Sequence, residues 1–182
     1  MKTTLYVVGQ TVGWFACVVG AAHGRDWLGL LVVAVLLVLH LCMHGKRPAG
    51  RIVMLAAVSL VFGFAFDSLL ILAGVYEPVR WVIPAPWATI WLLALWVNFA
   101  LIVDVPLKWL QHHLVIAAVC GGIFGPLAYL AGRRLGAIRI AEPTMFHVAV
   151  LSIAWALGLA ALMFIARRLP PFELQRNAPN ES

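Results

Sequence analysis

Apolar residues of this 182-residue chain fall into six blocks, separated by short connectors that carry charge, Pro and Gly. The blocks cover residues 5–22, 28–43, 52–74, 88–105, 114–131 and 144–166. A helix of about twenty apolar residues spans the hydrocarbon core of a bilayer. The blocks run on without alternation, which favours helices over a β-barrel. The pattern therefore predicts an all-α, polytopic membrane protein with six transmembrane helices in one bundle.

Composition supports a membrane over water as the solvent. Hydrophobic residues make up 64% of the chain and charged residues 11%, too little charge to cover a soluble domain of this size. The predicted transmembrane domain covers residues 1–169, and residues 170–182 form a polar tail. The first block is preceded by Lys2 and interrupted by Gln10, Thr11 and Trp14. It is long enough to span, so we expect it to stay as the first helix instead of acting as a signal peptide.

The distribution of Lys and Arg predicts the orientation. Eight of these residues lie on the side of the two termini and of connectors 2–3 and 4–5, and five lie on the other side. The excess places both termini in the cytoplasm, in what we expect to be a bacterial inner membrane. The formal charge of +6 is spread over all the loops, which indicates contact with lipid headgroups and no nucleic-acid partner. Three arginines in connector 5–6 reduce the bias; they indicate either a weak topology signal or a cationic site.

Asp67 is the most informative polar residue. It lies in the third block, about 10 Å from the end of the predicted helix at the usual rise per residue. A carboxylate at that depth is costly, so it is expected to point inward and to be paired or protonated. Gly63 shares its face at i−4 spacing and would let a neighbouring helix approach closely. Two interpretations remain open: a structural hydrogen bond, or a functional carboxylate next to Ser68.

Further polar side chains follow at the predicted outer ends of the last three helices. Tyr129 and Arg133 share one face of the fifth helix, and Arg133 is long enough to reach a buried carboxylate or an anionic headgroup. His147, one turn inside the sixth helix, could exchange protons near neutral pH. The predicted catalytic residues are Asp67 and His147, and the predicted substrate-binding residues are Ser68, Trp91, Tyr129, Arg133, Arg134 and Glu142. Each also has a structural interpretation, such as snorkelling for Arg133 or membrane-interface anchoring for Trp91.

The rest of the sequence gives little sign of cofactor chemistry. His40 and His44 are four residues apart, and His112 and His113 directly precede the fifth block, but interfacial histidines are commonly solvated. We therefore expect no metal and no cofactor. The three cysteines lie inside apolar blocks without CxxC spacing, so neither a disulfide nor a zinc site is predicted. Asn98, in the middle of the fourth block, is expected to hydrogen-bond to another helix.

Three segments carry a resemblance to a known family: FDSLLILAG at 66–74, WLLALWVNFA at 91–100 and GPLAYLAGRRLGA at 125–137. Together they resemble the uncharacterised bacterial inner-membrane family called domain of unknown function 2878. The most specific parts are the pair Asp67 and Ser68, and the Gly-Pro-x-x-Tyr motif of 125–129. The resemblance extends from the first helix to the sixth. It implies a small multi-helix inner-membrane protein and supplies no mechanism.

Three functions compete on this basis. The first is a protein that binds or modifies a lipid or other amphiphile with an anionic head, at the outer ends of helices three to six. The second is a small proton-coupled transporter in which Asp67 alternates between protonated and charged states. The third is a structural subunit of a membrane complex, and self-association is compatible with all three. Asp67 lies away from the midplane and the two halves of the chain do not match, which disfavours the transporter.

Overall fold

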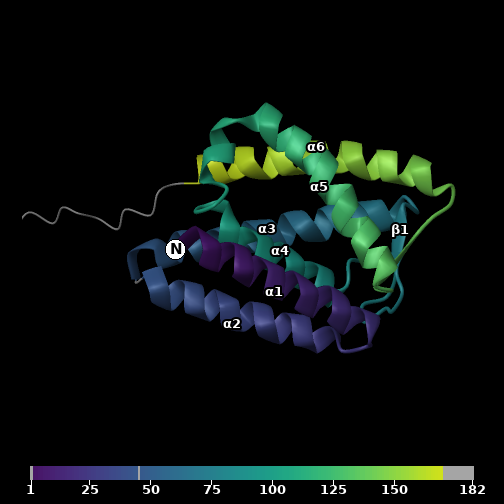
Figure 1. Ribbon diagram of the computed structural model, residues 1–182, viewed down its shortest axis with the longest axis horizontal. Helices are drawn as coiled ribbons and strands as arrows, with labels where there is room; N and C mark the ends of the chain where they lie inside the picture. Colours follow the sequence, from purple (N-terminus) through teal and green to yellow (C-terminus); the bar gives the residue numbers. More distant parts are fainter. Residues whose placement is uncertain (1, 45, 170–182) are drawn as a thin grey trace, which may run out of the picture.

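A computed structural model describes residues 2–44 and 46–169; the predicted tail, 170–182, lies outside the described residues. The described chain is mostly helical, as predicted (Figure 1). Its α-helices are α1 (Lys2–Ala22), α2 (Asp26–His44), α3 (Lys46–Leu72), α4 (Ile90–Val103), α5 (Leu114–Arg134) and α6 (Thr144–Arg168). Five of these, all except α4, are long and apolar enough to cross a membrane. The chain is thus an all-α protein of the multi-pass membrane type.

Helix α4 is shorter than the fourth predicted span. The pattern predicts a helix over 88–105, whereas α4 has 14 residues, or about 21 Å at 1.5 Å per residue, against a hydrocarbon core of about 30 Å. At its start Thr89 has an extended backbone, and at its end Asp104 turns the chain away. A short 3-10 helix, η1 (Lys108–His112), follows before α5. The structure therefore supports five full-length spans and one short apolar helix.

The helices form two groups. Helix α4 packs against α1, α2 and α3, while α5 packs mainly against α6 and runs obliquely to the other helices (Figure 1). The side chain of Asn98 in α4 donates a hydrogen bond of 3.0 Å to the carbonyl of Gln10 in α1, which confirms the predicted bond to another helix. Helix α5 makes few close backbone approaches to α1 or α4, and this leaves room between the two groups.

A small sheet that the sequence pattern did not predict closes one end of the bundle. Strand β1 (Tyr76–Pro78) pairs antiparallel with β2 (Ile138–Ile140). Along each strand burial alternates, so that the central Glu77 and Arg139 are exposed and their neighbours are buried. Gly74 and Gly136, both with positive φ, end α3 and α5 and turn the chain into the strands. We call this the β-sheet end, and the opposite end, which contains Arg51 and η1, the Arg51 end.

The distribution of polarity is the reverse of that in a soluble protein. Long apolar side chains on the outside are largely exposed, for example Leu69 at 64%, Val115 at 79% and Leu157 at 69%. Polar Ser59, at 0%, and Asp67, at 1%, are buried within the bundle. Such an apolar surface is expected to be covered by lipid, since soluble proteins rarely expose large apolar patches.

Candidate functional site

Asp67 lies on the inner face of α3 and accepts three hydrogen bonds. The Tyr129 hydroxyl donates to Oδ1 at 2.5 Å, the Tyr76 hydroxyl donates to Oδ1 at 2.7 Å, and Trp96 Nε1 donates to Oδ2 at 2.6 Å. The three donors come from α5, β1 and α4, and none of them carries a charge. The carboxylate thus joins three other elements, the neighbouring β1 and the more distant α4 and α5, to α3.

The two tyrosines pack against each other as well as against the carboxylate. Their rings are 4.8 Å apart and nearly perpendicular, an edge-to-face arrangement that aromatic pairs favour. Tyr76 reaches the site because β1 turns its side chain inward at the β-sheet end. Burial, and secondly the charge of Asp67, raise the pKa of Tyr76 well above its ordinary value. Tyr76 is therefore a neutral hydrogen-bond donor across the physiological range.

Trp96, the third donor, is the centre of an aromatic cluster. Its ring stacks on Trp155 of α6 at 5.2 Å with an interplanar angle of 2°, and Phe66 of α3 packs edge-on at 5.5 Å. Gly63 makes room for the indole, because a Cβ at that position would lie only 2.0 Å from the Trp96 ring. The close approach predicted for the Gly63 face is thus an approach by a tryptophan of α4.

Glycines of α5 accommodate Trp155 in the same way. A Cβ on Gly125 would lie 2.2 Å from the ring of Trp155, and one on Gly121 would lie 2.2 Å from its backbone oxygen. The two glycines are one turn apart on α5 and explain why α5 and α6 pack so closely. Trp155 thereby becomes a wall between α6 and the interior of the bundle.

A cavity of about 390 Å³ adjoins this cluster. Its walls come from α1, α4, α5 and α6, with Asp67 and Tyr129 toward the β-sheet end and η1 toward the Arg51 end. The lining side chains are mostly apolar or aromatic, among them Trp14, Trp91, Leu95, Phe99, Phe124 and Trp155. Within the described chain, Gln10 is the lining residue with an amide group and Asp67 the one with a carboxylate.

A second polar group lies at the β-sheet end, outside the aromatic cluster. Arg133 Nη1 donates to Thr144 Oγ1 at 2.8 Å, and its Nη2 lies 3.2 Å from Glu142 Oε1. Glu142 also accepts a 2.7 Å bond from the backbone N–H of Thr144 at the start of α6. The bonds to Thr144, and next the charge of Arg133, lower the pKa of Glu142.

The structure thus divides the predicted site residues into two groups. Asp67 and Tyr129 are bonded directly, and Trp91, 3% exposed, lines the same cavity. Ser68 Oγ accepts a 3.0 Å bond from the backbone N–H of Ala88 and so fixes the segment before α4. Arg133 and Glu142 form the group at the β-sheet end described above.

Two further predicted residues lie near that second group. Arg134 is exposed at the end of α5, next to Arg133. His147 Nδ1 lies 3.2 Å from the carbonyl oxygen of Pro143, and its ring packs against Phe146. Within the described chain neither residue hydrogen-bonds to Asp67, whose partners are Tyr76, Trp96 and Tyr129.

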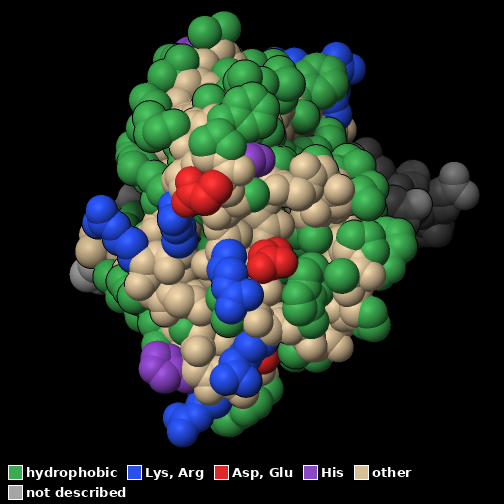
Figure 2. Space-filling model, turned by 90° about the vertical axis from the view of Figure 1, so that its right-hand side faces the viewer, with side chains coloured by type: hydrophobic (Ala, Val, Ile, Leu, Met, Phe, Trp, Pro, Cys, Tyr) green, Lys and Arg blue, Asp and Glu red, His purple; other side chains and the backbone are tan. Residues whose placement is uncertain are grey.

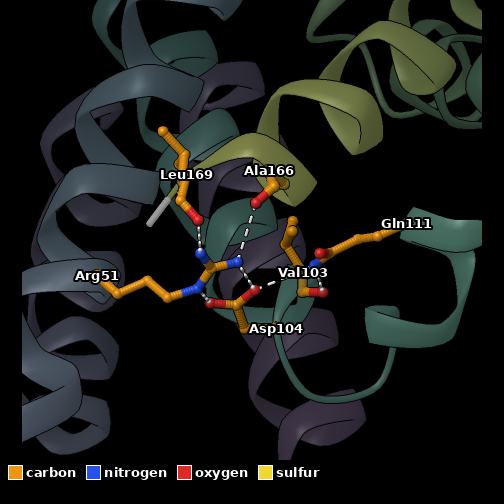
Figure 3. A network of polar contacts seen from close by, with 6 residues as sticks. All are labelled: Arg51, Val103, Asp104, Gln111, Ala166 and Leu169. Carbon is orange, nitrogen blue, oxygen red and sulfur yellow. Dashed lines mark hydrogen bonds and ion pairs between the residues drawn. The ribbon is translucent and has the colours of Figure 1, made fainter. Parts of the chain in front are cut away.

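An ion pair between Arg51 and Asp104 connects helices at the Arg51 end. The sequence pattern did not single out Asp104. Arg51 binds Asp104 through two hydrogen bonds of 2.5 and 2.8 Å (Figure 3). Its guanidinium also donates to the carbonyls of Ala166 and Leu169 at the end of α6. Gln111 of η1 donates to Asp104 at 3.0 Å. One arginine of α3 therefore connects the ends of α4 and α6, and the same pair explains why the chain turns at Asp104.

His40 is buried, and its ring packs edge-on against Tyr6 at 5.2 Å; the side chain of His44 lies outside the described residues. Among the described residues, no group of three or more His, Cys, Asp or Glu is placed to hold a metal ion.

Sequence reasoning singled out Tyr129 but missed Tyr76 and Trp96, the other two partners of Asp67, and Trp155, which stacks on Trp96. Tyr76 was read as part of a connector, and Trp96 and Trp155 as ordinary apolar positions within their blocks. A signal for the tryptophans was present: Gly63 on α3 and Gly125 on α5 leave space that the rings of Trp96 and Trp155 fill. That signal shows where an indole would fit and leaves open which helix supplies it.

Comparison with known proteins gives a family and nothing closer. The model of the family described as protein of unknown function (DUF2878) matches residues 4–161. The chain belongs to this family. A search of curated proteins found no match, and neither did a search of solved structures. The part matched to DUF2878 includes Asp67 and all three of its donors, as well as Arg133 and Glu142. Because the family is described without an activity, the function of this DUF2878 member has to be argued from its geometry.

Proposed function

We propose that this protein binds an amphiphile within a bacterial inner membrane and holds its apolar chain in the cavity between α1, α4, α5 and α6. The observation that carries the proposal is the cavity itself, about 390 Å³ in volume and lined by aromatic and aliphatic side chains. Small-molecule sites in proteins have volumes of roughly 300–1,000 Å³ and similar linings with few polar groups.

The shape of the cavity fits a chain better than a compact molecule. Lining residues on α5 extend from Cys120 to Gly132, a distance of about 18 Å at the helical rise. A volume of 390 Å³ holds roughly a dozen groups of methylene size, at about 30 Å³ each, the share of a water molecule in the liquid. One acyl or isoprenoid chain of medium length would therefore fill it.

The cavity has a side from which a lipid could enter. Trp109 of η1 and Phe124 of α5 both line the cavity and are 53% and 66% exposed. Helix α5 hardly approaches α1 and α4, so the gap between these helices faces the hydrocarbon region. Entry from the bilayer needs no passage through water, which suits a ligand that partitions into the membrane.

In this proposal Asp67 is a positioning residue. Its carboxylate holds Trp96, Tyr76 and Tyr129 in one arrangement, and Trp96 and Tyr129 form part of the cavity wall. Rigid walls improve binding because less conformational freedom is lost when the ligand arrives.

We further propose that the Arg51 end faces the cytoplasm. Connectors 1–2, 3–4 and 5–6 lie at the β-sheet end of the bundle, and connectors 2–3 and 4–5 lie at the Arg51 end (Figure 1). Of the twelve Lys and Arg in the described residues, seven belong to the end that contains Arg51 and five to the β-sheet end, as expected if the Arg51 end is the inner side.

The proposal is tested by comparing ligand binding to the wild type with binding to a variant in which a larger side chain fills the cavity. Dodecanol carrying a fluorescent or isotopic label would be titrated into the protein in nanodiscs, with empty nanodiscs as the blank. Ala128→Trp, at a cavity-lining position of α5, is expected to abolish saturable binding. Leu127→Trp is the matched control, because Leu127 is 53% exposed and lies outside the cavity lining; it should bind as the wild type does. Absence of saturable binding to the wild type would favour a structural role for the protein instead.

A further inference from the structure

A second hollow, of about 430 Å³, lies at the β-sheet end, where α5 is followed by β2. It is lined by Val79, Arg133, Gly136, Ile138, Arg139 and Ile140. Its two charged residues are both arginines, one at the end of α5 and the other at the centre of β2. We call it the arginine groove. Figure 2 looks onto this end of the molecule, where basic side chains gather with acidic ones beside some of them.

The arginine groove and the apolar cavity adjoin each other. Ile138 belongs to the lining of both, and Gly132, which lines the cavity, directly precedes Arg133, which lines the groove. An elongated molecule lying along α5 would therefore pass from apolar surroundings to two guanidinium groups within one turn of the helix. That succession of surfaces complements an amphiphile with an anionic head.

Both arginines have hydrogen-bonding capacity to spare. Arg133 is bonded to Thr144 and Glu142, and Arg139 to Glu77 at 3.4 Å, whereas a guanidinium carries five N–H donors. Their side chains are 40% and 68% exposed, and ion pairs in such positions are weak. A phosphate can therefore bind beside the glutamates or replace them, and its oxygens match the fork of a guanidinium.

The β-sheet end as a whole also carries a net positive charge. The β-sheet end has five arginines, Arg25, Arg80, Arg133, Arg134 and Arg139, and its described acidic residues are Asp26, Glu77, Glu142 and the buried Asp67. The excess of positive charge attracts anions to this surface. It also accounts for the three arginines that reduced the topology bias in the sequence.

We propose that the ligand is a single-chain lipid phosphate or diphosphate, with the phosphate bound by Arg133 and Arg139 and the chain passing Ile138 into the apolar cavity. This inference rests on the proposed function, since the chain occupies the same cavity. It adds the chemical class of the head and the residues that recognise it.

The test compares dodecyl phosphate, dodecanol and inorganic phosphate on the full chain in nanodiscs of a zwitterionic lipid. The wild type is expected to bind dodecyl phosphate about tenfold more tightly than dodecanol, as for a charge-assisted pair of hydrogen bonds. The double variant Arg133→Gln, Arg139→Gln should bind both with equal affinity and keep the wild-type affinity for dodecanol, which shows that the fold is intact. Arg80→Gln, at the same end but outside the groove lining, should keep the preference for phosphate.

The other outcomes separate this inference from the proposed function. Equal affinities in the wild type, both lost in Ala128→Trp, would overturn the phosphate inference and leave amphiphile binding in place. Inorganic phosphate that binds as tightly as dodecyl phosphate, regardless of Ala128→Trp, would make the groove a site for free anions and overturn the single-ligand arrangement. If neither chain binds saturably, the proposed function fails together with the inference.

Discussion

Replacement of Asp67 by leucine is expected to loosen the wall of the cavity. The variant keeps a side chain of similar size but leaves three buried donors, the hydroxyls of Tyr76 and Tyr129 and Nε1 of Trp96, without their acceptor. Hydrogen bonds inside membrane proteins contribute roughly 0.6–2 kcal/mol each. Three of them predict a loss of about 2–6 kcal/mol in the free energy of unfolding, reduced somewhat because the buried charge is removed as well.

Asp67→Asn is the matched control. With its amide turned so that the oxygen accepts from Trp96, the two N–H groups can donate to the two tyrosine oxygens, since a phenol hydroxyl is both donor and acceptor. All three partners then remain bonded, and we expect a change within about 1 kcal/mol of the wild type.

The assay is equilibrium unfolding of the purified protein in mixed micelles with increasing SDS, followed by tryptophan fluorescence. Dodecanol binding would be measured on the same samples, where the leucine variant should bind weakly and the asparagine variant as the wild type does. A leucine variant that is as stable as the wild type and binds dodecanol normally would refute the role of the carboxylate as organiser of the wall. An asparagine variant as damaged as the leucine variant would show that the charge itself is needed.

Three further predictions follow from other contacts. Gly63→Ala should destabilise by about 1–3 kcal/mol in SDS unfolding, as for overpacked cores, because its Cβ would lie 2.0 Å from the indole packed against it; Gly9→Ala, whose nearest neighbour is 3.5 Å away, should be neutral. Arg51→Met should cost about 1–3 kcal/mol by leaving Asp104 without its charged partner; an unchanged midpoint would mean that the pair contributes no net stability. The pKa of Tyr76 is raised in the folded state, so its contribution is present below the ordinary phenol pKa of about 10 and lost above it. Tyr76→Phe should therefore flatten the decline of the SDS midpoint at alkaline pH, and an equal decline in both proteins would contradict this.

The helices could be predicted from the sequence because one physical requirement, a continuous apolar length, sets each of them. Asp67 was likewise conspicuous, since an intramembrane carboxylate has to be satisfied by something. What satisfies it could not be predicted. Tyr76 enters through a strand that forms only when β1 meets β2, and Trp96 enters because α4 packs against Gly63. Both depend on contacts between segments that are distant along the chain.

The end of α4 likewise depends on a contact that is distant along the chain. Hydropathy extends the apolar block over 88–105, but α4 ends at Val103, because Asp104 turns toward Arg51 of α3. That pairing joins residues 53 positions apart, beyond the reach of any local pattern. Similarly, Arg133 was expected to reach either a headgroup or Asp67, and only the position of Glu142 and Thr144 determines where its guanidinium lies.

Whether the cavity holds the chain of an amphiphile is tested most directly by photolabelling with a dodecyl probe that carries a diazirine at the end of its chain. After irradiation in nanodiscs, the labelled residues would be mapped by peptide mass spectrometry. Labels are expected on Leu95, Phe99 and Phe124, which line the cavity, and these labels should be lost in Ala128→Trp. Labels confined to outward-facing residues of α2 such as Leu31 and Leu39, both more than half exposed, and unaffected by Ala128→Trp, would contradict it.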